Sequence, residues 1–216
     1  MFLEGMRQAV LAATNEIVRR DLVSGTAGNV SASDPNTGYV AITPSAMPYE
    51  SMEPADIVIV DDRGQVVDGR LRPSSETPMH LCVYRHRPWV RAVVHTHSPY
   101  ATTFACLGQE IPAVHYLIAF AGRRIPVATY ASYGTVELGD EAAQAMGDGK
   151  AVLLQQHGVL AAGRTLTEAV MVAGVVEYVA GIYYRARQLG SPKILPEAEV
   201  ERLRARFETY RPEPNP

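Results

Sequence analysis

The sequence predicts an α/β fold in which one mixed β-sheet carries helices on both faces. The first third of the chain contains paired short apolar runs joined by turn residues, and the second half alternates strand-like with helix-like patterns. Paired runs are typical of antiparallel hairpins, and the later alternation is typical of a sheet covered on both sides. With 216 residues and 47% hydrophobic content, the chain can bury one sizeable core, so we expect residues 1–216 to form a single domain.

In order, a helical spacing of apolar residues predicts the first element, and small polar residues with glycines then end it. A hairpin follows, then a strand with its partner. The next helix is expected to start with Ser75 as its N-cap and with Glu76 and Pro78 in its first turn. The expected elements of this half are a helix at 2–23, strands at 30–33, 38–43, 57–61 and 65–67, a helical turn at 54–56 and a helix at 75–88.

In the second half, strands and helices alternate. Thr165 or Thr167 is expected to cap a long apolar helix, because a threonine side chain can accept a hydrogen bond from the first helical turn. The expected elements are a strand ending at 97, a helix at 98–107, short strands and loops over 111–130, a helix at 134–146, strands at 150–156 and 159–163, and helices ending near 189 and at 196–210.

The charge pattern argues against two classes of partner. The net charge is −3, both signs are dispersed, and no long basic block is present. We therefore expect a small-molecule partner, no nucleic acid and no membrane. No secretory pattern opens the sequence, and Cys82 and Cys106 lie in apolar, helix-like surroundings. We expect both to be buried reduced thiols, which suits a cytoplasmic protein.

Three histidines carry the strongest chemical signal. His95 and His97 are two residues apart after apolar β-branched residues, and alternate residues of a strand share one face. His157 follows another apolar strand and precedes a glycine, so its imidazole is expected at a strand end. Three imidazoles that converge on one divalent metal leave a coordination position open for chemistry. Zinc is the favoured ion, although iron, cobalt or manganese could replace it, and the alternative is a set of hydrogen-bonded core histidines.

Glu76 has two interpretations. It is either a capping carboxylate at a helix start or a carboxylate close to the metal that acts as a general base. His80, four residues later on the same helical face, is expected to be a core histidine or to support the site from behind.

Three short segments of small residues resemble the backbone and hydroxyl cradles that bind phosphate. Each segment alone is typical of an ordinary turn. Together, around a metal-binding strand, they would form a site for a small phosphorylated, oxygen-rich substrate. The segments are Thr26-Ala27-Gly28-Asn29, Ser45 with its neighbours, and Ser74-Ser75.

Six motifs, in order over most of the chain, resemble the class II aldolase and adducin family, in particular its sugar-phosphate aldolases. The resemblance implies a three-layer α/β/α sandwich with a largely antiparallel central sheet, and a homotetramer with active sites between subunits. The motifs are Gly-Thr-Ala-Gly-Asn-Val-Ser (25–31), Ile-Thr-Pro-Ser-Ala-Met-Pro-Tyr-Glu (42–50), Pro-Ser-Ser-Glu (73–76), Val-Val-His-Thr-His (93–97), Ala-Val-His-Tyr-Leu-Ile-Ala-Phe-Ala-Gly (113–122) and Gln-His-Gly (156–158).

The resemblance also implies roles for individual residues. It implies that Glu76 is the metal-proximal base, that Tyr116 from a neighbouring subunit donates a proton to the aldehyde oxygen, and that Tyr210 on a mobile tail helps to close the site. His95, His97 and His157 would bind zinc together with Glu76. The phosphate would be held by Gly28, Asn29, Ser45, Ala46, Ser74 and Ser75.

The implied reaction is zinc-dependent cleavage of a ketose 1-phosphate, similar to L-fuculose 1-phosphate, to dihydroxyacetone phosphate and an aldehyde such as lactaldehyde. Where the family has Thr-Gly, this chain has Ser45-Ala46, and the added methyl group is expected to tighten or shift the phosphate pocket. The same metal site would also serve a ribulose-phosphate 4-epimerase or a methylthioribulose-phosphate dehydratase. From a different class, an adducin-like protein would use the fold for binding without catalysis.

Overall fold

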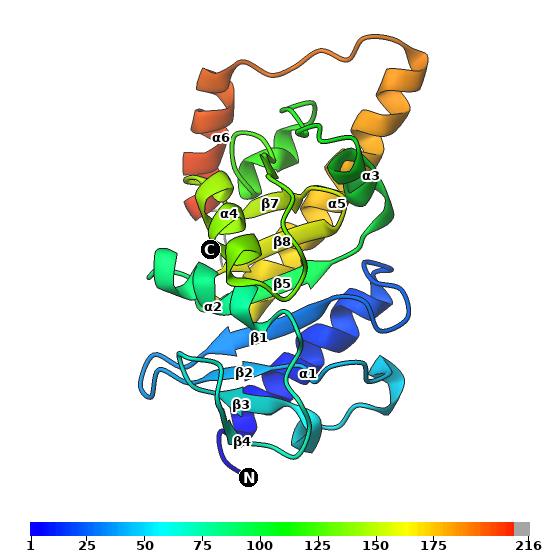
Figure 1. Ribbon diagram of the computed structural model, residues 1–216. Helices are drawn as coiled ribbons and strands as arrows, with labels where there is room; N and C mark the ends of the chain where they lie inside the picture. The colour runs from blue at the N-terminus through cyan, green and yellow to red at the C-terminus, as the bar shows by residue number, and fades with distance from the viewer. Residues whose placement is uncertain (210–216) are drawn as a thin grey trace, which may run out of the picture.

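The computed structural model describes residues 1–209, and these residues build one sheet between two helical layers (Figure 1). The sheet has the strand order β4-β3-β2-β1-β5-β8-β7-β6. Neighbouring strands run antiparallel except for β6 and β7, which are parallel. The strands are β1 (Asn29–Ser33), β2 (Val40–Ile42), β3 (Val58–Val60), β4 (Val66–Asp68), β5 (Ala92–Thr96), β6 (Val127–Ala128), β7 (Ala151–Leu154) and β8 (Gly158–Gly163).

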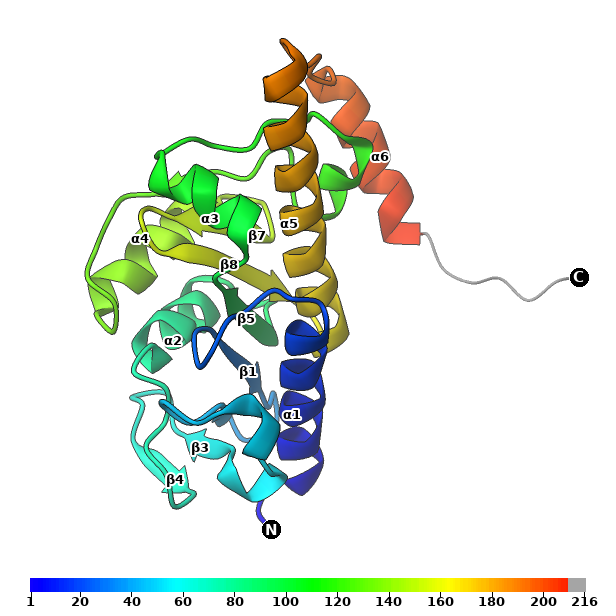
Figure 2. The same ribbon diagram turned by 90° about the vertical axis from the view of Figure 1, so that its right-hand side faces the viewer.

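Helices cover both faces, which confirms the predicted mixed sheet and its layers. Figure 2 shows α1 and α5 on one face, and α2 and α4 lie on the other, where α4 contacts β6 and β7. The helices are α1 (Glu4–Arg19), α2 (Thr77–His86), α3 (Pro99–Cys106), α4 (Val136–Met146), α5 (Leu166–Leu189) and α6 (Glu197–Thr209), with short 3-10 helices η1 (Tyr49–Ser51), η2 (Pro54–Asp56) and η3 (Tyr116–Phe120).

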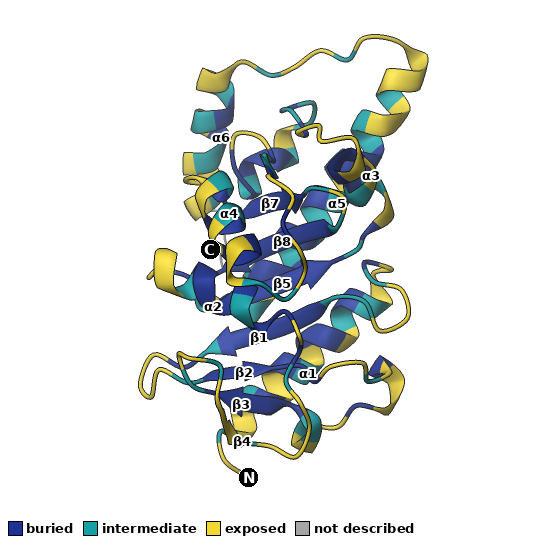
Figure 3. Ribbon diagram, in the orientation of Figure 1, coloured by how far each residue is buried: buried dark blue, intermediate teal, exposed yellow. Residues whose placement is uncertain are grey.

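The central strands are buried on both faces, as Figure 3 shows. On β5, Val94 packs into the core beneath α1 and α5, whereas its neighbour Val93 packs beneath α2 and α4. A strand between two helical layers needs apolar residues on both sides, which explains its nearly continuous apolar run. The two polar residues on the α2 face of β1, Asn29 and Ser31, break this rule, while Val30 between them joins the opposite core.

Helix α5 is long and apolar enough to cross a membrane by length and composition, a weak signal that core helices also give. In the structure it packs on β5 and β8, and Val172, Val176 and Val179 are fully buried. That packing is typical of a core helix. Its N-cap is Thr165, whose side chain accepts a hydrogen bond from the Glu168 N–H, as predicted.

Two local predictions were wrong. The N-cap of α2 is Glu76, which makes no side-chain capping bond, and Ser75 lies before it. The Ser74 Oγ accepts a hydrogen bond from the Glu76 N–H, so it stabilises the turn just before the helix rather than capping its first turn. Cys106 is exposed at the end of α3, whereas Cys82 is buried, and both thiols are free. Cys106 lies on the solvent side of the last turn of α3, whereas its apolar neighbours Phe104 and Ala105 are buried.

Candidate active site

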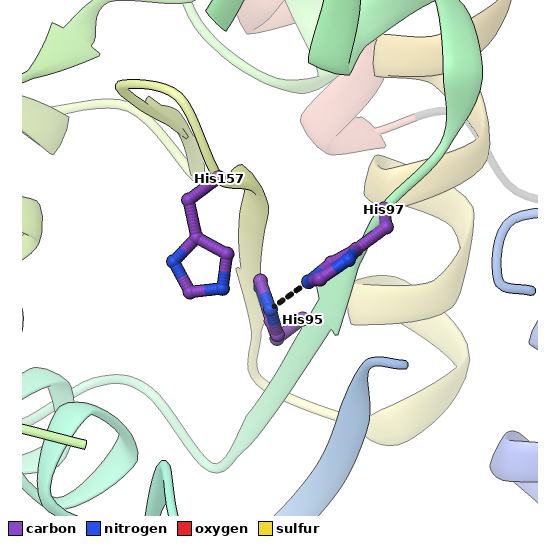
Figure 4. A group of neighbouring side chains, drawn as sticks. All are labelled: His95, His97 and His157. Atoms are coloured by element: carbon purple, nitrogen blue, oxygen red, sulfur yellow. Dashed lines mark hydrogen bonds between the residues drawn. The ribbon is translucent and has the colours of Figure 1, made fainter. Parts of the chain in front are cut away.

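The three histidines converge at one end of the central strands. His95 is the fourth residue of β5, His97 follows its last residue, and His157 lies in the turn between β7 and β8 (Figure 4). The Nε2 atoms of His95 and His97 lie 2.9 Å apart. The ligating atoms of all three histidines lie within 4.8 Å of one another. The predicted histidine centre, defined by His95, His97 and His157, is therefore present.

Two close contacts between backbone segments allow the three histidines to converge. Gly28 has φ +90°, and a Cβ there would lie 2.7 Å from the His95 carbonyl oxygen. Gly158, directly after His157, has even less room, because a Cβ would lie 2.4 Å from the Thr96 carbonyl oxygen. Any side chain at either position would push the strands apart. The two glycines of the motifs thus allow the segments beside β5 to lie against it.

Hydrogen bonding prepares His95 to coordinate a metal ion. Its Nδ1 donates to the Val159 carbonyl oxygen at 2.9 Å, so Nε2 presents a lone pair to the centre. This arrangement is typical of metal-binding histidines, in which the second ring nitrogen donates to a carbonyl and fixes the tautomer. Burial, followed by the charge of neighbouring imidazoles, lowers the pKa of His97 and of His157 to about 4, which favours neutral ligands.

Glu76 lies beside the histidines. Its Oε2 is 3.1 Å from His95 Nε2, and its Oε1 is 3.3 Å from His157 Nε2. Burial raises the pKa of Glu76, but positive charge at His95 and His157 and the amide of Asn29 outweigh it and lower the pKa well below its ordinary value. With neutral imidazoles, a bound cation would supply that positive charge. Glu76 makes no side-chain capping bond, and its carboxylate instead lies against the imidazoles of the histidine centre.

The cluster fits a bound cation. Glu76 Oε1 is buried without a hydrogen-bond partner among the described residues. An ionised carboxylate and several imidazole lone pairs crowded into one buried space repel one another unless positive charge lies among them. Imidazole and carboxylate donors together suit zinc and similar divalent transition metals. The chain therefore offers a donor set appropriate to such an ion.

The predicted phosphate-binding segments lie around the same cavity. It has a volume of about 350 Å³ and contains Gly28, Asn29, Ser45, Ala46, Ser74 and Ser75, together with Glu76, His97 and His157 among its lining residues. This size suits a small metabolite. The structure therefore brings together every predicted metal and phosphate residue, with His95 fully buried at the centre.

Backbone pairing joins the second and third segments. Pro44 and Pro73 form a β-bridge, in which the Ser45 N–H donates to the Arg72 carbonyl at 3.0 Å and the Ser74 N–H donates to the Thr43 carbonyl at 3.0 Å. The bridge places Ser45 and Ala46 beside Ser74 and Ser75. Ala46 has φ +57°, in the left-handed region that favours glycine.

The structure adds two residues that sequence reasoning missed. Tyr130 and Tyr133 line the cavity in the segment before α4, and their side chains are more than half exposed, at 55% and 72%. Their segment carries no charge or metal-binding pattern. The signal that could have found them is the Tyr-Ala-Ser-Tyr-Gly run (130–134), in which two aromatic residues stand in a loop rather than in a strand or helix.

One predicted residue does not line this cavity, and another cannot be placed relative to it. Tyr116 begins η3, is 49% exposed, and does not line the cavity of its own chain. Its ring packs near those of His115 and Phe207. Tyr210 lies outside the described residues.

Known proteins resemble this chain over nearly its whole length. The model of the class II aldolase and adducin N-terminal domain matches residues 8–184. A 5-deoxy-D-ribulose 1-phosphate aldolase of Bacillus thuringiensis is 45% identical over 97% of this chain and 99% of its own. An L-fuculose phosphate aldolase of Escherichia coli strain K12 is 40% identical over 90% of each chain.

The fold is shared as well. A solved L-fuculose 1-phosphate aldolase superposes with a TM-score of 0.92 at 42% identity, covering 94% of this chain and 96% of that one. With the family match, this similarity shows that the chain belongs to the class II aldolase and adducin family.

Proposed function

We propose that this member of the class II aldolase and adducin family is a lyase that cleaves a ketose 1-phosphate to dihydroxyacetone phosphate and a short aldehyde. One observation carries the proposal. A buried carboxylate, Glu76, lies within 3.3 Å of two imidazole nitrogens and lines the same cavity as three small-residue segments. The cavity thus combines a base, a donor set for a metal and an anion cradle.

The donor set would hold zinc or another divalent transition metal through His95, His97 and His157, with Glu76 beside them. When bound, the metal supplies positive charge that stabilises the negative charge developing on the carbonyl and hydroxyl oxygens of the substrate. His95 keeps its ligating nitrogen aimed at the centre through its bond to Val159.

Glu76 is the proposed base, removing or returning the proton on the substrate carbon that becomes part of dihydroxyacetone phosphate. Its low pKa keeps it ionised at neutral pH. Tyr116, supplied by a neighbouring subunit of a homotetramer, is proposed to transfer a proton to or from the aldehyde oxygen, and Tyr210 is proposed to help close the site. The exposure of Tyr116 on its own chain supports this division of labour.

The phosphate is proposed to lie against Gly28, Asn29, Ser45, Ala46, Ser74 and Ser75. Their hydroxyl and N–H groups can donate to phosphate oxygens without adding a lysine. One N–H of the Asn29 side-chain amide already donates to Glu76, so its second N–H is the one assigned to the phosphate.

Two substrates are supported. L-fuculose 1-phosphate would give lactaldehyde, and the names of the relatives from E. coli and the solved aldolase support it. 5-Deoxyribulose 1-phosphate would give acetaldehyde, and the relative of 45% identity over 97% of the chain supports it. Both share the dihydroxyacetone phosphate half, so the two differ only in the aldehyde that Tyr130 and Tyr133 would border.

The test is a release assay for dihydroxyacetone phosphate over a panel of ketose 1-phosphates that includes both candidates. Cleavage is expected with at least one of them, lost after verified metal removal and restored by zinc. Full activity in a metal-free sample would contradict the metal assignment. Products without a triose phosphate, namely an epimer or a dehydrated ketone, would favour the epimerase or dehydratase alternatives. Absence of both metal and turnover would favour an adducin-like binding protein.

A further inference from the structure

A chain of hydrogen bonds runs from the back of α2 to Glu76. Tyr84 Oη and Ser31 Oγ lie 2.7 Å apart, and Ser31 Oγ lies 2.6 Å from His80 Nδ1. His80 Nε2 lies 2.6 Å from Asn29 Oδ1, and Asn29 Nδ2 donates to Glu76 Oε2 at 2.9 Å. We call these five residues the Glu76 relay.

The direction of each bond follows from its two ends. An ionised carboxylate only accepts, so the NH2 group of Asn29 must face Glu76 and its Oδ1 must face His80. His80 therefore donates through Nε2, and in the neutral ring its Nδ1 accepts from the Ser31 hydroxyl. Tyr84 then donates to the Ser31 oxygen. In all four hydrogen bonds, each residue donates to the next one nearer the Glu76 carboxylate.

The position of His80 favours this neutral form. The side chain is fully buried on the face of α2 that covers β1, and burial lowers the pKa of His80 to about 3. Asn29 is opposite His95 in the β1–β5 register, so the relay enters the histidine centre from the strand next to β5. Strand alternation places Ser31 on the same face as Asn29, which explains the two polar residues inside an otherwise apolar layer.

We propose that His80 is a positioning residue, which fixes the Asn29 amide as a donor to Glu76 and so holds the carboxylate in line for proton transfer. This inference rests on the proposed function, since it gives Glu76 a task that needs defined placement. A flipped Asn29 would turn its carbonyl oxygen toward an anionic oxygen and repel it. His80 prevents that flip because its Nε2–H can pair only with an acceptor.

Variants of His80 separate positioning from simple core packing. His80→Gln can donate to Asn29 and accept from Ser31, whereas His80→Leu fills the space but does neither. We expect His80→Leu to lower kcat about 10–100-fold with KM changed less than about threefold, as is usual for residues behind a metal site. His80→Gln should recover most of the lost kcat. His86→Leu, on the exposed end of the same helix, is the matched control and should stay within about twofold of wild type.

Bound metal and melting temperature are measured for each variant. Reduced kcat with normal metal content supports the inference. Wild-type kcat in His80→Leu would show that His80 does not position Glu76. Loss of bound metal in both His80→Leu and His80→Gln would show the same. If His80→Leu does not fold, the tautomer measurement described next decides the inference in its place.

A second measurement is independent of turnover and so separates failure of this inference from failure of the proposed aldolase activity. Long-range ¹⁵N–¹H spectra of histidine-labelled, metal-loaded protein report the tautomer of each ring, and His80→Gln identifies its signal. We expect the neutral Nε2–H tautomer at neutral pH. A protonated ring or an Nδ1–H tautomer would overturn the inference even in an active enzyme, whereas an inactive enzyme with the expected tautomer would overturn only the reaction.

Discussion

The histidine centre and the surface around η3 differ in how firmly one chain holds the groups proposed to act there. At the centre, Glu76 and His95 are buried, and hydrogen bonds from Asn29 and to Val159 fix both groups. On η3, Tyr116 is 49% exposed and packs against other rings outside the cavity. The difference teaches that burial within one chain orients Glu76 and His95, whereas the exposed Tyr116 is proposed to gain its position in a site from a second copy of the chain.

The largest expected effect is at the centre. Glu76→Gln keeps the size of the side chain and its bond from Asn29 but removes the base. We expect kcat to fall about 10²–10⁴-fold, the usual range for general-base removal. Metal content is measured alongside turnover. Near-normal turnover would remove Glu76 from the role of base.

A smaller loss of kcat is expected from a substitution on the surface around η3. Tyr116→Phe removes only a hydroxyl from an exposed ring, so the melting temperature should not change, while kcat falls about 10²-fold. Mixing subunits of Glu76→Gln and Tyr116→Phe tests the comparison directly. Since each variant supplies what the other lacks, sites formed between them should regain activity after exchange of subunits. If the mixed samples stay inactive, Glu76 and Tyr116 act in the same site from the same chain.

His80 predicts a pH effect on stability. Its pKa is about 3 in the folded chain, below its ordinary value of 6.5. Between pH 6.5 and pH 3, His80 binds a proton in the unfolded chain but not in the folded chain. The free energy of unfolding therefore falls as the pH decreases from 6.5. The loss approaches about 1.4 kcal/mol per pH unit for one group. Denaturant titrations from pH 7 to pH 5 should show a shallower pH dependence in His80→Gln than in wild type, and equal slopes would contradict this.

The smallest expected effect is at Ala46, where φ is +57°. Ala46→Gly relieves the steric cost of the left-handed region, about 1 kcal/mol, but adds comparable freedom to the unfolded chain. Stability should change by less than about 1 kcal/mol. The looser loop must be ordered around the phosphate, so we expect KM to rise about twofold to fivefold. An unchanged KM would show that the methyl group does not shape the pocket.

Much of this architecture was predictable because its signals are local. The hairpin of β1 and β2, the pair β3 and β4, and the cap at Thr165 each depend on residues a few positions apart. The convergence of His95 and His97 also follows from neighbouring positions. The start of α2 was misplaced by one residue because Ser75 matches the side-chain pattern of an N-cap, whereas the folded chain places Glu76 there without a side-chain capping bond.

The sequence by itself determined the chemistry available: three imidazoles, one carboxylate among small polar residues, and glycines at the close approaches. Tertiary structure decided how they combine. Asn29 reaches Glu76 and His80 over 47 and 51 residues of chain, and only the pairing of β1 with β5 under α2 brings them together. Tyr130 and Tyr133 likewise enter the cavity from a distant loop. Such contacts depend on long-range packing, which no local pattern of residues encodes.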